Sequence, residues 1–174
     1  MRPAIEFIKN KFGDIPLIGA EIGVAEGLHA KELYRNLNFN KLYLIDIWEV
    51  YYVHREGKEI KISVPAQGLS KVKEMFEGIS NVAIIKGDSA EVASQFENES
   101  FDFIYIDGNH DYEFVKKDIE LYYPKVKKGG ILCGHDFQND IMAWEGVDRA
   151  VREFAIDKKI IINHKDWDWW IIKR

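Results

Sequence analysis

The chain has 174 residues, which is enough for one complete hydrophobic core and too short for two ordinary domains. Its 47% hydrophobic and 30% charged residues are typical of a soluble globular protein, and no apolar run approaches the roughly 18–20 residues that cross a bilayer. The net charge of -5 argues against a nucleic-acid partner, because phosphate binding depends on clustered Lys and Arg. The start of the chain lacks the uninterrupted apolar stretch of a signal peptide, and Cys133 is the one cysteine. We therefore expect one cytoplasmic domain over residues 1–174, with no membrane partner.

Apolar runs of strand length alternate with helical patterns along the chain. Their near-continuous apolarity is typical of strands that are covered on both faces, as in a parallel sheet. Between these runs, Ala30, Leu33 and Leu37 share one helix face, and Val115 and Ile119 share another. The alternation predicts an α/β fold of repeating β-α units. The expected strands are Leu17 to Val24, Leu42 to Ile47, Val82 to Lys86, Phe101 to Ile106 and Ile131 to Gly134.

The C-terminal part predicts one more helix and an antiparallel edge. Val147, Val151 and Phe154 mark an amphipathic helix. Two strands about a short polar turn are then expected, at Ile160 to Asn163 and Trp169 to Ile172. A C-terminal hairpin of this kind closes an otherwise parallel sheet.

Other stretches are harder to interpret. Residues 49–66 (EVYYVHREGKEIKISVPA) are polar and aromatic and lie before a helix that we expect to begin near Gln67. Residues 139–146 (NDIMAWEG) follow the last strand of the parallel series. Long connections at strand ends usually carry function, so we expect both to contribute to a substrate pocket. Gly129-Gly130, after the basic run Lys125 to Lys128, predicts the C-terminus of a helix.

The stretch GAEIGVAEGLHA, residues 19–30, is a glycine-containing turn after the first strand. A dinucleotide fingerprint needs G-x-G-x-x-G, but counting from Gly23, Ala25 and Leu28 occupy the next two glycine positions. A Walker loop, G-x-x-x-x-G-K-[ST], is also absent from the sequence. A phosphate-binding role for Gly23 and Gly27 is therefore disfavoured.

Acidic residues stand where the predicted strands end. Such a ring of carboxylates repels phosphates and attracts a cationic ligand with hydroxyl and amino groups, which describes S-adenosylmethionine. Asp46 is placed to accept both ribose hydroxyls, and Asp88 to accept from the adenine amino group. The alternative is that these aspartates cap the helices that follow. The acids are Glu21, Glu26, Asp46, Asp88 and Asp107.

These residues carry a family resemblance. Glu21-x-Gly23-x-x-x-Gly27, Asp46 and Gly87-Asp88-Ser89 resemble motifs of the class I S-adenosylmethionine-dependent methyltransferases. More specifically, Tyr105 to Phe137, which pairs IDGNHxYxxVxxD with GGxxxxHD, resembles the small-molecule group that includes macrolide-sugar and cephalosporin-biosynthesis methyltransferases. The resemblance implies a three-layer α/β/α, Rossmann-like fold. Its seven strands would run in the order 3-2-1-4-5-7-6, with strand seven antiparallel.

Two histidine-acid pairs follow the predicted strands, His110-Asp111 and His135-Asp136. Together with Asp107 they supply the candidate catalytic residues, which are Asp107, His110, His135 and Asp136. Because adjacent strands lie close together, Asp107 and Asp136 are expected to converge. Metal-dependent O-methyltransferases carry acids at equivalent places, which implies a Mg²⁺ site of Asp107, His135 and Asp136. The presence of His135 in place of an acid leaves open a metal-free reaction in which a histidine is the base. His110 fits a base, a ligand or a structural role.

The function expected is methyl transfer from S-adenosylmethionine to a hydroxyl of a small molecule, such as a sugar or another hydroxylated metabolite. The resemblance also implies cofactor contacts from Glu26, Gly27 and Ser89, and Trp48 either covers the ligand or packs in the core. One alternative is an NAD(P)-dependent oxidoreductase, which the missing fingerprint disfavours. Another is a catalytically silent cofactor-binding assembly module. The acceptor and a homodimer are left open.

Overall fold

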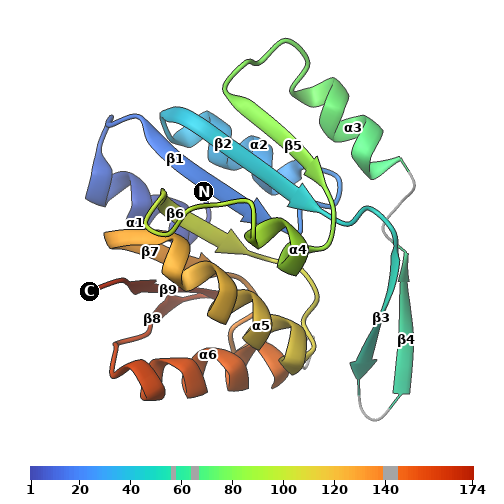
Figure 1. Cartoon of the computed structure of the whole chain (residues 1–174), viewed down its shortest axis with the longest axis vertical. Coiled ribbons are helices and arrows are strands. Elements are labelled where there is room, and N and C mark those ends of the chain that lie inside the picture. Colours follow the sequence, from blue (N-terminus) through green and yellow to red (C-terminus); the bar gives the residue numbers. More distant parts are fainter. Residues whose placement is uncertain (56–57, 64–66, 139–144) are drawn as a thin grey trace.

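The computed structural model describes residues 1–55, 58–63, 67–138 and 145–174, and its centre is a seven-stranded sheet (Figure 1). The strand order is β5-β2-β1-β6-β7-β9-β8. The first five strands are mutually parallel, and β9 pairs antiparallel with both β7 and β8. Two further strands form a separate hairpin outside this sheet, and the order of the seven sheet strands along the chain confirms the prediction. The strands are β1 (Leu17–Ile22), β2 (Phe39–Asp46), β5 (Val82–Lys86), β6 (Phe101–Ile106), β7 (Val126–Gly134), β8 (Asn163–Lys165) and β9 (Asp168–Ile172).

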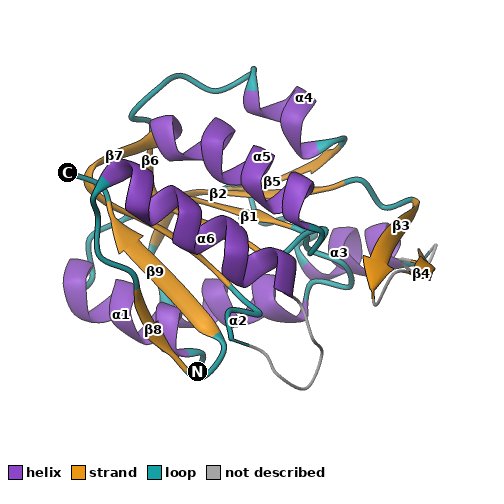
Figure 2. Cartoon of the chain, turned by 90° about the horizontal axis from the view of Figure 1, so that it is seen from below, coloured by secondary structure: helices purple, strands orange, loops and turns teal. Residues whose placement is uncertain are grey.

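Helices cover both faces of the sheet and make the predicted three layers (Figure 2). One face carries α1 (Pro3–Phe12), α2 (Leu28–Asn36) and α3 (Gly68–Met75). The other face carries α4 (Ser89–Ala93), α5 (Tyr112–Tyr122) and α6 (Glu145–Lys158), with a short 3₁₀ turn at Tyr123–Lys125. None of the helices in the described ranges has the length and apolarity that a bilayer crossing requires.

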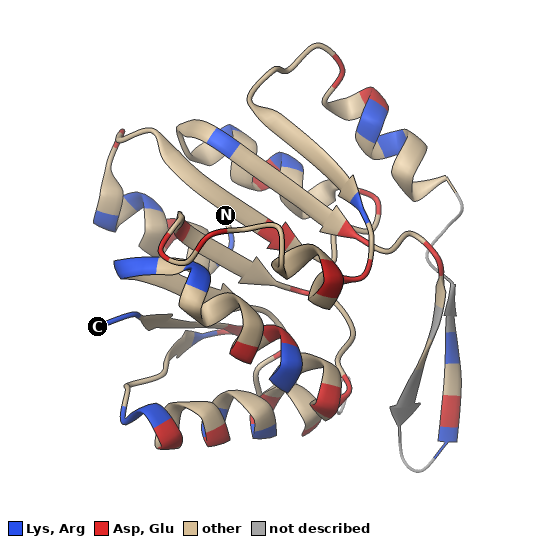
Figure 3. Cartoon of the chain, in the orientation of Figure 1, with Lys and Arg blue, Asp and Glu red and all other residues tan. Residues whose placement is uncertain are grey.

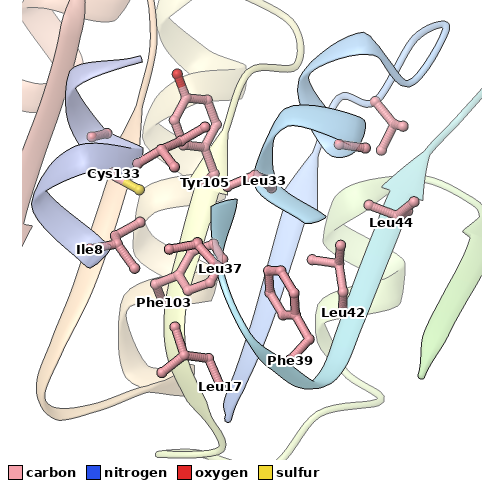
Figure 4. Packing of buried hydrophobic residues seen from close by; sticks show 14 of the residues in the cluster. Ile8, Leu17, Leu33, Leu37, Phe39, Leu42, Leu44, Phe103, Tyr105 and Cys133 are labelled. Atoms are coloured by element: carbon pink, nitrogen blue, oxygen red, sulfur yellow. The ribbon is translucent and has the colours of Figure 1, made fainter. Parts of the chain in front are cut away.

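The two faces bury separate hydrophobic clusters, which explains the unbroken apolar runs of the strands. On the α1 side, Ile8, Leu33 and Phe103 pack together (Figure 4). Gly19 of β1 faces the Phe103 ring, since a Cβ at Gly19 would lie 2.4 Å from a ring carbon. The strand therefore needs glycine there so that the aromatic ring fills the space between β1 and α1.

Residues 49–66, for which no secondary structure was predicted, contain a two-stranded hairpin of β3 (Val50–Arg55) and β4 (Lys58–Ser63). It projects from the carboxyl edge of the sheet, away from the two helical layers (Figure 1). Val50, Tyr52 and Ile60 are exposed, as are the neighbouring charged residues. The run Val50 to Val53 does not alternate, which hides the first strand, whereas Ile60 and Ile62 alternate with polar residues in the second, a signal that was overlooked.

Several predicted boundaries were wrong. The strand expected at Ile160 to Asn163 lies instead at Asn163–Lys165, and Ile161 is exposed. Gly129-Gly130 lies inside β7 and does not end a helix, because the chain enters that strand directly at Val126. Lys125 to Lys128 likewise spans the end of the 3₁₀ turn and the start of β7.

Two helices were not predicted, α1 and α4. The first precedes the first strand, and the second has only five residues, too few to show a periodic pattern. The helix expected near Gln67 is confirmed as α3. Most of the predicted 139–146 pocket segment, residues 139–144, lies outside the described residues.

Candidate active site

A cavity opens at the carboxyl ends of β1, β2, β5 and β6, the edge where open α/β sheets bind ligands. Figure 3 shows acidic residues at the ends of β1 and β2 on this edge. Four carboxylates line the cavity, from Asp46, Asp88, Asp107 and Asp118. Apolar walls come from Ile22, Ile45, Ile47 and Phe114. The predicted cofactor residues Gly23 and Ser89 also line it.

Gly23 lets the loop after β1 pass directly over the end of β6. Its φ angle is +87°, and a Cβ there would lie 2.1 Å from the carbonyl oxygen of Asp107. Both the dihedral angle and the available space therefore require glycine. The predicted glycine motif brings the loop against Asp107 at this edge.

Asp46 holds the loops on both sides of the cavity. Its Oδ2 accepts a hydrogen bond from the Ala25 N–H at 2.8 Å, and its Oδ1 accepts from the Trp48 N–H at 2.6 Å. Ala25 and Trp48 both have positive φ angles, of 50° and 43°. The carboxylate thus fixes two strained turns, a common feature of ligand-binding loops. Each of its oxygens keeps one further acceptor position, and the two hydrogen bonds fix the direction of that position.

Asp88 caps a helix, which is one of the two roles that the sequence left as alternatives, and contact with adenine stays a prediction. Its Oδ1 accepts from the N–H groups of Ala90 and Glu91 and caps α4, while the residue also lines the cavity. Ser89, next to it, donates its hydroxyl to Asp118 at 2.5 Å. Burial raises the pKa of Asp118 to about 6, although the Ser89 hydrogen bond opposes the shift.

Four of the predicted cofactor residues do not line this cavity, and their contact with the cofactor stays a prediction. Glu21 is buried and pairs with His29, with 3.1 Å between Oε1 and Nδ1. Glu26 instead pairs with Lys71 at the surface. Gly27 begins α2 with a φ of 81°, and the Trp48 ring packs in the core, its Nε1 donating to the Ala25 carbonyl.

A second group of charged residues lies beside the cavity. His110 Nε2 is 2.8 Å from Asp136 Oδ2 and 3.5 Å from Asp107 Oδ1. Burial alone would lower the pKa of His110, but the two carboxylates raise it to about 9. Burial alone would raise the pKa of Asp107, but His110 and Arg2 bring it below its usual value. Ligand atoms of Asp107, His110 and Asp136 lie within 4.8 Å of one another, close enough to hold one metal ion.

The cluster that the structure brings together differs by one residue from the metal set expected from the sequence, which stays a prediction. His110, rather than His135, joins Asp107 and Asp136. The His135 ring lies against Trp167, with its Nε2 3.9 Å from Asp168, while its Nδ1 stays 3.3 Å from Asp136. His135 thus contacts the cluster from outside. Asp136 has a φ of 59°, the left-handed conformation, which directs its carboxylate differently from that of a regular strand residue.

Sequence reasoning missed three residues around this cluster, Arg2, Tyr105 and Asp168. Arg2 Nη1 donates to Asp107 Oδ2 at 3.1 Å and to the Tyr105 hydroxyl at 2.8 Å. That hydroxyl donates to Asp168, which also accepts from the Ala4 N–H. No pattern pointed to Arg2. Asp118 was also missed, although a signal existed, because it falls on the apolar face of α5 defined by Val115 and Ile119.

Comparison with known proteins identifies the family. A family model described as a methyltransferase domain matches residues 20–137, about two thirds of the chain. The chain belongs to this methyltransferase family. A curated relative, uncharacterized protein R132 of Acanthamoeba polyphaga mimivirus, is 31% identical over 142 residues. That match covers 78% of this chain, and the chain spans 58% of the relative's length.

Solved methyltransferases share the fold along almost the whole chain. The calicheamicin methyltransferase CalS11 is 17% identical with a TM-score of 0.71, over 97% of this chain and 77% of its own. A putative methyltransferase of Streptococcus mutans, in complex with S-adenosylhomocysteine, is 16% identical with a TM-score of 0.69. That match covers 100% of this chain and 99% of the other. MycE of the mycinamycin pathway, in complex with Mg and S-adenosylhomocysteine, is 18% identical with a TM-score of 0.63. That match covers 98% of this chain and 48% of the MycE chain.

Proposed function

We propose that this methyltransferase domain, residues 1–174, transfers a methyl group from S-adenosylmethionine to a hydroxyl of a small molecule. The observation that carries the proposal is the geometry of Asp46. Its two oxygens each accept one backbone N–H and each retain one acceptor position. Two neighbouring ribose hydroxyls match two such positions on one fixed carboxylate. The residues present therefore fit the nucleoside end of the methyl donor.

The rest of the cavity supports the same ligand. Asp88 uses Oδ1 for its helix cap, and among the described residues no hydrogen-bond partner reaches its Oδ2. That oxygen is available to an amino group such as that of adenine. Ile45, Ile47 and Phe114 provide apolar surface for a flat base. A pyrophosphate, by contrast, would lie among carboxylates, which argues against the oxidoreductase alternative.

The cluster of Asp107, His110 and Asp136 provides the reaction centre in this proposal. When bound, S-adenosylmethionine supplies a methyl group on a positively charged sulfur, already activated for displacement. The task left to the protein is to align an acceptor oxygen in line with that methyl and to hold the proton that the hydroxyl loses. Asp136 is the group of this cluster that can take that proton, because a pKa of about 9 leaves His110, 2.8 Å away, already protonated at neutral pH.

The donor set also fits Mg²⁺, because two carboxylates of the cluster offer oxygen ligands. Asp107, His110 and Asp136 would hold the ion, and it would lower the pKa of an acceptor hydroxyl next to it. The solved MycE complex contains Mg, which supports testing this ion first. His135 has a supporting position toward Asp136 in both the metal-assisted and the metal-free reaction.

Calorimetry with S-adenosylhomocysteine and, separately, with NAD⁺ tests the proposal. We expect the first to bind and the second not to. Incubation with S-adenosylmethionine and a set of sugars and catechols, with Mg²⁺ or with EDTA, should then release S-adenosylhomocysteine in an acceptor-dependent way. Binding of NAD⁺ alone would favour the oxidoreductase, and cofactor binding without turnover on any acceptor would favour the silent module. The cytoplasmic location and a homodimer stay predictions.

A further inference from the structure

Arg2 contacts Asp107, one of the residues that line the cavity. Its side chain is 31% exposed, and its Nη1 contacts both Asp107 and the Tyr105 hydroxyl. Its Nη2 and Nε have no hydrogen-bond partner among the residues that the structure describes. Arg2 therefore keeps donors for an anionic group beside Asp107, because the guanidinium has five N–H donors.

Two buried polar atoms without partners lie close to the same tyrosine. Glu21 Oε2 and His29 Nε2 lack a hydrogen bond within the described part of the chain, and their residues are 1% and 8% exposed. The His29 ring lies 4.1 Å from the Tyr105 ring, and the Arg2 guanidinium carbon lies 5.8 Å from that ring. Buried polar atoms without partners cost free energy, so this region is prepared for a polar ligand.

The N-terminus of α2 adds a favourable field for a negative group. His29 is the second residue of this nine-residue helix, which has no side-chain cap and no acidic residue in its first turn. The N–H groups at such an end carry partial positive charge and attract anions. Arg2 lies against this helix, since its backbone N–H donates to Glu32.

The group thus offers positive donors and negative acceptors side by side. Arg2 and the start of α2 suit a carboxylate, whereas Asp107 and Glu21 suit an ammonium group. That combination matches the zwitterion of an α-amino acid. Asp46 ends β2 and Asp107 follows β6, two strand spacings away, or about 10 Å. A ligand whose nucleoside lies at Asp46 would extend its other end to Arg2.

We propose that Arg2 binds the carboxylate of the methionine end of the methyl donor. This inference rests on the proposed function and specifies which residue of this chain recognises the amino-acid end. The guanidinium keeps its Nη1 contact with Asp107 and uses Nη2 and Nε for the ligand. Asp107 then faces the ligand ammonium, so that one ion pair orients both charges of the zwitterion.

The test compares two ligands by calorimetry. S-Adenosylhomocysteine carries the amino-acid end, whereas 5′-methylthioadenosine keeps the nucleoside and the thioether without it. Arg2→Met should weaken S-adenosylhomocysteine binding about 10- to 100-fold and leave 5′-methylthioadenosine binding within about twofold. Arg2→Lys, which keeps the charge, should recover part of the loss. Arg35→Met removes an arginine from the exposed surface of α2 and should change neither affinity.

Other results would overturn the inference. If Arg2→Met weakened the binding of both ligands equally, Arg2 would only support the fold. Thermal unfolding of the variant would then show a loss of stability. Unchanged binding of both ligands would remove Arg2 from the site. Wild-type protein that binds neither nucleoside would overturn the proposed function itself, which distinguishes that failure from a failure of the Arg2 assignment.

Discussion

Replacing Asp46 is the most direct test of the cofactor site. In the structure this carboxylate serves two purposes, because it accepts the N–H groups of Ala25 and Trp48 and also faces the cavity. Asp46→Ala leaves the buried Trp48 N–H without a partner, at about 1–3 kcal/mol, and frees the partly buried Ala25 N–H at a smaller cost, so a stability loss of about 1–4 kcal/mol is expected. The loss of charged hydrogen bonds to the ligand adds a separate binding effect of about 1.5–3 kcal/mol.

The binding effect corresponds to a weakening of about 10- to 150-fold in the dissociation constant for S-adenosylhomocysteine. Calorimetry at a temperature where the variant remains folded measures it, and urea unfolding measures the stability loss. Asp46→Asn keeps one acceptor oxygen, so its affinity and stability should lie between those of the wild type and Asp46→Ala.

A matched control separates the two effects. Asp102 accepts a hydrogen bond from the Ile18 N–H at 2.7 Å and forms an ion pair with Lys127, but it does not line the cavity. Asp102→Ala should lower stability and leave ligand affinity unchanged. The reasoning would be wrong if Asp46→Ala lost stability but kept the same ligand affinity as Asp102→Ala. Asp46 would then have a structural role, and its two remaining acceptor positions would not contact the ligand.

Three further predictions address other parts of the site. Gly23→Ala should destabilise the protein by about 3 kcal/mol or more, because its Cβ would overlap the Asp107 carbonyl. Gly78→Ala, with a φ of +72° and open space, should cost about 1 kcal/mol in urea unfolding. Asp118→Asn should raise the unfolding free energy at pH 8 by at most about 3 kcal/mol and have little effect at pH 4. The reason is that the pKa of Asp118 in the folded protein, about 6, lies above the ordinary 3.8, so the wild-type protein loses stability as the pH rises from about 4 to 6. An equal effect of the substitution at pH 4 and pH 8 would contradict this reasoning. Asp136→Asn, which tolerates the left-handed conformation, should abolish methyl transfer in an S-adenosylhomocysteine release assay while calorimetry shows cofactor affinity within about twofold.

The fold was largely predictable because the central strands are buried on both faces. Val82–Lys86 and Phe101–Ile106 have the predicted bounds, since continuous apolar runs of that length have few other solutions. The hairpin β3–β4 was missed because the run Val50 to Val53 does not alternate, although Ile60 and Ile62 of the second strand do alternate with polar residues. The position of β8 was wrong for a related reason, since Ile161 is apolar and exposed.

The site could be predicted only where a residue's role depends on its position along a strand. Asp46 and Asp107 stand at strand ends, and topology alone brings them to one edge of the sheet. The choice between His110 and His135 depends on side-chain direction in two loops, which spacing does not encode. Arg2 depends on a contact across 105 positions of the chain, from the residue before α1 to the residue after β6, so it had no local signal.

The structure also changes the electrostatic argument made from the sequence. A ring of acids was expected to attract a cation through its combined charge, but each carboxylate is compensated in its own way. Asp46 and Asp88 accept backbone N–H groups, Asp107 faces Arg2 and His110, and burial moves the pKa of Asp118 toward neutrality. The cavity therefore recognises its ligand through directed acceptor atoms more than through a general negative field. Directed acceptors discriminate hydroxyl and amino groups by position, and such discrimination is what a nucleoside with an amino-acid end requires.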